Sequence, residues 1–143
     1  MALRLPKAMV EEMIAHARED LPNEACGVIL GRNGVAMELH RARNAEASPY
    51  RYVIHPEDLI RFHRIVEEKD WQFLVIYHSH VASEAYPSPT DVRMSIWPNT
   101  DPPLDAYPDA HYVLVSLADR ENPVVRAFRI TGGVVSEEPL ETV

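Results

Sequence analysis

The sequence has a single cysteine, no long apolar run and few basic residues. Cys26 alone cannot form an internal disulfide, which fits a reducing cytoplasm. No stretch approaches the roughly 20 consecutive apolar residues of a membrane helix. The N-terminal segment carries acidic residues inside its apolar pattern, unlike a signal peptide, so we expect it to be part of the fold. The sequence predicts a cytoplasmic protein with no membrane partner.

Basic residues are outnumbered, with 14 Lys and Arg against 22 Asp and Glu and a formal net charge of −8. Nucleic-acid binding depends mainly on neutralising phosphates, and no basic cluster is present, so we expect no nucleic-acid partner. What the chain does have is an apolar fraction of 46% in 143 residues, enough to bury one core. We therefore expect a single domain over residues 1–143. The oligomeric state stays open, a homodimer included.

Apolar spacing and turn residues predict the order of the elements. Helices are expected over 5–20, from helical apolar spacing, and from Pro56, where proline and acidic residues open a first turn. Strands are expected over 25–31 and 35–43 as a hairpin, and over 73–77, 111–117, 124–130 and 134–135. Residues 98–108 hold four prolines and predict a surface loop. Helices and strands mix without strict alternation, which indicates the α+β class.

His78 and His80 follow the most apolar strand of the chain. Residues i and i+2 of a strand project to the same face, so both imidazoles can converge on one point. Two partly exposed histidines at a strand end would give the same pattern, so the pair alone leaves a metal site and no site equally open.

Asp91 lies in the tetrad Ser88-Pro89-Thr90-Asp91, which is typical of a helix start with Ser at the N-cap and Pro at N1. Asp91 can be both a residue of a helix cap and a metal ligand, because a helix N-terminus would hold its carboxylate rigidly. Two imidazoles and one carboxylate would leave a tetrahedral zinc one open position, as in catalytic sites, whereas a structural zinc usually needs cysteines. We therefore expect a metal bound here to serve catalysis.

Glu24 is the candidate base that would deliver a proton from metal-activated water to the leaving group. An ordinary solvated glutamate is the alternative. Cys26, two residues on, is explained as a small buried hydrophobe, and a reactive thiol beside His78 or His80 is the less favoured alternative. The other histidines have no partner at ligand spacing.

In their order along the chain, these residues resemble the JAMM/MPN+ zinc metalloprotease family, whose domain is also called JAB. Glu24, His78-Ser79-His80, Ser88 and Asp91 match its pattern E…H-S-H-x7-S-x-x-D. The similarity extends to its first strand and middle segment. The matching residues of the first strand are Glu24-Ala25-Cys26-Gly27 and Gly31, and those of the middle segment are Asn44, Ser48-Pro49 and Tyr52. Tyr107-Pro108, before the strand expected over 111–117, also fits the family pattern.

The resemblance implies that His78, His80 and Asp91 bind Zn²⁺, that Glu24 is the general acid/base, and that Ser88 donates a hydrogen bond to the oxyanion. It also implies the family's curved mixed sheet packed with helices, a cytidine-deaminase-like fold. One departure is Val81, since proline is common after the second histidine in the family. This departure concerns the shape of the following loop and with it substrate preference.

The compact length resembles bacterial members of the family, which cleave ubiquitin-like or sulfur-carrier proteins after a C-terminal Gly-Gly, from an adduct such as cysteine or from a protein. An extended Gly-Gly tail can lie beside a strand edge and be held through its backbone. We therefore expect a zinc peptidase or isopeptidase with such a carrier as its substrate. Three alternatives remain: a non-catalytic MPN-type scaffold, a zinc hydrolase of a small-molecule amide, and a cysteine hydrolase using Cys26.

Overall fold

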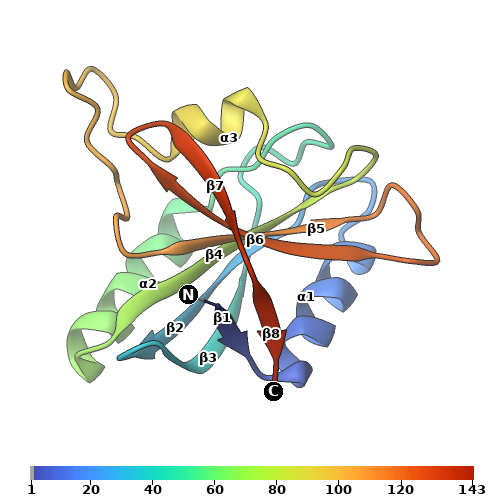
Figure 1. Ribbon diagram of the computed structural model, residues 1–143, viewed down its shortest axis with the longest axis horizontal. Coiled ribbons are helices and arrows are strands. Elements are labelled where there is room, and N and C mark those ends of the chain that lie inside the picture. Colours follow the sequence, from blue (N-terminus) through green and yellow to red (C-terminus); the bar gives the residue numbers. More distant parts are fainter. Residues whose placement is uncertain (1) are drawn as a thin grey trace.

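A mixed sheet of six strands forms the centre of the structure, a computed structural model that describes residues 2–143 (Figure 1). The strand order is β3-β2-β4-β5-β6-β7, and β4 and β5 run parallel while the other neighbours are antiparallel. The bounds are β2 Cys26–Arg32, β3 Val35–Ala42, β4 Gln72–His80, β5 His111–Ser116, β6 Val124–Thr131 and β7 Val134–Glu138. Two short strands from the ends of the chain, β1 (Leu3–Leu5) and β8 (Leu140–Thr142), pair in parallel.

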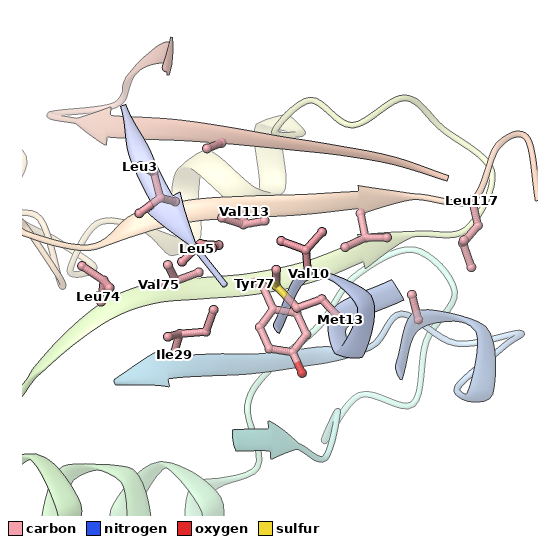
Figure 2. Packing of buried hydrophobic residues seen from close by; sticks show 13 residues of the cluster. Leu3, Leu5, Val10, Met13, Ile29, Leu74, Val75, Tyr77, Val113 and Leu117 are labelled. Carbon is pink, nitrogen blue, oxygen red and sulfur yellow. The ribbon is translucent and has the colours of Figure 1, made fainter. Parts of the chain in front are cut away.

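Two helices cover opposite faces of the sheet, because strand side chains alternate between faces. Helix α1 (Lys7–Glu19) packs its Met13 with Val75 and Tyr77 of β4, as Figure 2 shows. Helix α2 (Pro56–Lys69) packs its Phe62 with Ile76, the residue between those two. The apolar run 73–77, predicted as a strand, therefore supplies both cores from the middle of the sheet. Within residues 2–143 no helix has the length and apolarity to cross a membrane.

The hairpin of β2 and β3 is as predicted. Asn33 and Gly34 form its turn, with φ of 53° and 77°. Positive φ at both central positions suits the right-handed twist of the strands and is best tolerated by Asn and Gly. The α+β class and the mixed sheet are confirmed as well.

The prediction that the first helix includes Leu5 is wrong. Leu5 belongs to β1, and α1 begins at Lys7. A residue that precedes proline is pushed away from helical backbone angles, and Pro6 therefore keeps Leu5 extended. Leu5 is buried in the α1 core and pairs with Thr142, a contact that local periodicity could not indicate.

Gly27 of β2 provides a test of the α1 core. A Cβ added at Gly27 would lie 2.4 Å from the Tyr77 ring, whose hydroxyl is hydrogen-bonded to His16 Nδ1 at 2.7 Å. We expect Gly27→Ala to lower the free energy of unfolding by about 1–3 kcal/mol, because overpacking displaces that ring. Urea unfolding measures the change. Gly34→Asn is the control, because that position is open and asparagine tolerates positive φ. Equal stabilities for the two variants would contradict this account of Tyr77.

Candidate metal centre

His78 and His80 are the last alternate residues of β4 and point to the same face, the one covered by α2. Their Nε2 atoms lie 3.2 Å apart. Both side chains are buried, His78 at 1% and His80 at 4% exposure. The structure therefore does not bear out the alternative of two partly exposed histidines at a strand end.

Asp91 lies in helix α3 (Pro89–Met94), whose start has Ser88 as the predicted N-cap and forms a complete capping box. The Asp91 N–H donates to Ser88 Oγ at 3.1 Å, and the Ser88 N–H donates to Asp91 Oδ2 at 2.8 Å. The same Oδ2 lies 3.1 Å from His78 Nε2 and 3.0 Å from His80 Nε2. The cap and the cluster thus occur together, and the cap fixes the carboxylate that completes the cluster.

The three facing atoms form an arrangement suited to a cation. His80 Nδ1 donates to the Glu84 carbonyl at 2.8 Å, so in the neutral ring Nε2 carries a lone pair. That lone pair faces a carboxylate oxygen and a second imidazole nitrogen. Zinc–ligand bonds of 2.0–2.1 Å in a tetrahedron place ligand atoms about 3.3 Å apart, close to the separations found here. Among residues 2–143, these three are the set of His, Cys, Asp and Glu side chains close enough to hold a metal ion.

The electrostatics of the metal-free site agree with this description. Burial lowers the pKa of His78 despite its contact with Asp91. Burial also opposes the charged form of His80, but hydrogen bonds to Asp91 and the Glu84 carbonyl outweigh it, and its pKa is raised. Burial alone would raise the pKa of Asp91, yet its bonds to both histidines bring it far below the usual range. An ionised carboxylate beside two imidazole nitrogens is a ligand set that a metal cation can take in place of the protons that these nitrogens share with it in the metal-free site.

Glu24 precedes β2 on the strand next to the histidines. Cys26 pairs with His78 and the Ser79 N–H donates to the Ala25 carbonyl, so Glu24 comes level with His80. Glu24 is 3% exposed, and within residues 2–143 its Oε1 has no hydrogen-bond partner. Burial, and to a lesser degree the Asp91 charge, raises its pKa to about 8, while nearby His80 lowers it. The alternative of a solvated glutamate is therefore wrong, and the carboxyl is suited to taking up and releasing a proton near neutral pH.

Ser88 and Glu24 line a cavity of about 360 Å³ together with His80 and with Tyr50, Pro49 and residues 81–83. Ser88 Oγ accepts the cap hydrogen bond, which leaves its hydroxyl proton free to donate into this space. Val81, the departure from the family pattern, forms part of the cavity wall. The structure thus brings together all five residues predicted for the site.

Cys26 is fully buried among the apolar residues of the α2 core. Burial raises the pKa of its thiol to about 12, so it is protonated at neutral pH. A nucleophilic cysteine must be a thiolate, and the structure therefore argues against the cysteine-hydrolase alternative.

Two contacts that support the site were not expected from the sequence. The Glu84 carbonyl orients His80, and a backbone atom leaves no signal in residue type. Ser79, between the two histidines, points to the other face and accepts a hydrogen bond from the Ala25 N–H at 2.8 Å. The alternation of a strand could have predicted this opposite orientation. Both contacts fix the end of β4 against its neighbours.

Comparison with known proteins places these observations in a family. The family described as prokaryotic homologs of the JAB domain matches residues 6–131. The CysO-cysteine peptidase of Mycobacterium tuberculosis is 44% identical over 137 residues, covering 94% of this chain and 87% of the relative. A probable TtuB-protein conjugate cleaving protease of Thermus thermophilus is 32% identical over 98 residues, covering 68% and 66%.

Solved structures show the same fold. Protein DSY2949 from Desulfitobacterium hafniense superposes with a TM-score of 0.79 at 31% identity, covering 98% of this chain and 92% of that protein.

The raised pKa of Glu24 predicts a pH dependence of stability in protein stripped of metal by a chelator. Between about 4.5 and 8 the folded protein retains a proton that the unfolded chain releases, so its free energy of unfolding falls as pH rises. Glu24→Gln lacks this titration. Thermal unfolding from pH 5 to 8.5 should show a steeper fall in Tm for the wild type than for Glu24→Gln. Parallel curves would contradict a buried, protonated Glu24.

Proposed function

We propose that this chain, which belongs to the family of prokaryotic homologues of the JAB domain, is a zinc-dependent peptidase or isopeptidase. Its proposed reaction is hydrolysis of the bond after the C-terminal Gly-Gly of a ubiquitin-like or sulfur-carrier protein. The observation that carries the proposal is the convergence of His78 Nε2, His80 Nε2 and Asp91 Oδ2 within 3.2 Å of one another, beside a buried Glu24. The proposed catalytic domain is the single domain of residues 1–143.

The names of the relatives support the substrate class. One relative is called a CysO-cysteine peptidase and another a probable TtuB-protein conjugate cleaving protease. A desampylase of Haloferax volcanii is 32% identical over 95 residues, covering 62% of this chain and 68% of the relative. Each of these names describes cleavage of a conjugate or adduct. We take a carrier joined through its C-terminus to cysteine or to a protein as the substrate, and the cytoplasm as the site of action.

His78, His80 and Asp91 are the proposed zinc ligands, and two imidazoles with one carboxylate suit zinc among the divalent ions. Zinc bound there would supply Lewis acidity and would make water a strong nucleophile at neutral pH. The helix cap at Ser88 and the Glu84 carbonyl keep Asp91 and His80 in their orientation. Three protein ligands leave room for water and the scissile carbonyl.

Glu24 carries the proton in the proposed reaction. Its carboxylate takes a proton from the attacking water and then delivers that proton to the nitrogen of the leaving amine, so that it ends the cycle ionised. The Ser88 hydroxyl donates a hydrogen bond to the oxygen of the scissile carbonyl as negative charge develops there. Both residues line the same cavity, so one substrate can contact them together.

Mass spectrometry of a sulfur-carrier protein extended by cysteine at its C-terminal Gly-Gly tests the reaction. We expect wild type to remove the cysteine, Glu24→Gln to keep its zinc but lose most turnover, and His78→Ala to lose both zinc and turnover. Zinc content is measured on each variant by elemental analysis. A protein conjugate of the carrier is assayed in parallel to separate the two kinds of adduct. Wild-type turnover in Glu24→Gln, or wild type free of metal after growth with zinc, would contradict the proposal.

Ser88 has a separate expected effect. Ser88→Ala should retain zinc, because the backbone N–H that holds Asp91 remains, but kcat should fall by about 10²–10³ if the hydroxyl stabilises the oxyanion. Ser88→Thr is the matched control, since threonine keeps both the hydroxyl and the helix cap. Steady-state kinetics compares the two variants. A loss in Ser88→Ala that appears only in thermal stability would assign Ser88 to the cap alone.

A further inference from the structure

The two histidines of the metal centre are held by different means. His80 donates Nδ1–H to the Glu84 carbonyl, the usual way in which a protein orients a metal-binding imidazole. His78 has no such partner, because within residues 2–143 its buried Nδ1 makes no hydrogen bond. Something else must set the rotation of the His78 ring.

Tyr52 supplies a contact of the required kind. Its ring stacks on the His78 imidazole with centroids 4.4 Å apart and an interplanar angle of 24°. Tyr52 is itself buried, at 7% exposure, in the α2 core. A flat ring packed against the face of His78 restricts rotation of the imidazole out of the shared plane.

Tyr52 lies in an irregular segment, and the Asn44 side chain fixes that segment on both sides of it. Asn44 Nδ2 donates to the Arg51 carbonyl at 3.0 Å, and Asn44 Oδ1 accepts from the Val53 N–H at 3.1 Å. The side-chain amide of Asn44 is therefore hydrogen-bonded to the residues directly before and after Tyr52. The same Nδ2 also donates to the Glu24 carbonyl at 3.1 Å, which ties this segment to the start of β2.

We propose that Tyr52 is a positioning residue that holds the His78 imidazole in its metal-binding orientation by ring stacking, and that Asn44 fixes Tyr52 for this role. The inference rests on the proposed function, since it takes His78 to be a zinc ligand. The contribution of Tyr52 comes from its ring, which makes the contact with His78. The Tyr52→Phe substitution should therefore preserve the orientation of the His78 imidazole.

Zinc affinity, measured by competition with a chromophoric chelator, tests the role. We expect Tyr52→Leu to weaken zinc binding by about 10–100-fold, the range seen when the support of a metal ligand is removed. Tyr52→Phe should stay within about 2-fold of wild type. The visible absorption of the Co²⁺-substituted protein should change in Tyr52→Leu and not in Tyr52→Phe, because it reports ligand geometry. Tyr52→Met serves the same comparison if Tyr52→Leu does not fold.

Phe62→Leu is the matched control for a loss of packing. Phe62 is a fully buried ring of the same core, in α2, and no ring contact to a metal ligand is found for it within residues 2–143. The Phe62→Leu substitution should lower Tm with little change in zinc affinity. Equal weakening in Phe62→Leu and Tyr52→Leu, or wild-type affinity in Tyr52→Leu, would overturn the proposal. Wild type that binds no zinc would instead refute the proposed function, so the two failures are distinguishable.

Asn44→Asp tests the role of Asn44. Aspartate keeps the hydrogen bonds that Asn44 Oδ1 accepts from the Glu46 and Val53 N–H groups, but it loses the two that Nδ2 donates to the Glu24 and Arg51 carbonyls. We expect weaker zinc binding in Asn44→Asp alone and no further weakening when it is added to Tyr52→Leu. Non-additive effects of this kind identify residues that act through one another. Additive losses would show that Asn44 acts on the metal centre by another route and would overturn its assignment to Tyr52.

Discussion

The crowding of three electron-pair donors at the end of β4 is the constraint on which the site depends. His78 Nε2, His80 Nε2 and Asp91 Oδ2 lie 3.0–3.2 Å apart in a buried environment, where such atoms repel one another unless a proton or a cation lies between them. Such an arrangement persists only if the surrounding structure enforces it. Strand alternation places the two histidines, a helix cap places the carboxylate, and the Glu84 carbonyl fixes the tautomer of His80.

The two faces of the sheet have different roles. One face forms an apolar core that makes the sheet rigid, and the other face carries the site. On the α1 face, Val75 and Tyr77 pack in an apolar core with the terminal strand β1 (Figure 2). On the α2 face, the same strand presents His78 and His80. Because consecutive residues of β4 serve the two faces, the site inherits the rigidity of the opposite core. A catalytic arrangement built on a strand in this way is held more accurately than one built on loops.

The features of the fold and the site that depend on residues close together in the sequence were predictable. The alternation at His78 and His80, the cap at Ser88 and the hairpin of β2 and β3 follow from residue type and spacing, and the structure confirms them. The burial of Glu24 was not predictable in this way, because the pairing of β2 with β4 across more than forty residues causes it. The place of Leu5 in a strand also depends on a long-range partner, the C-terminal strand β8.

Helix α3 shows how the metal and the fold support each other. It has six residues, too few to be stable without tertiary contacts. Its N-terminus is held by the Ser88 cap, and Asp91 of that cap is also the proposed metal ligand. A metal that binds Asp91 therefore fastens α3 to β4, and free energy of metal binding adds to the free energy of unfolding. Because Asp91 Oδ2 also accepts the Ser88 N–H, the serine that would contact the oxyanion is fixed by the same carboxylate.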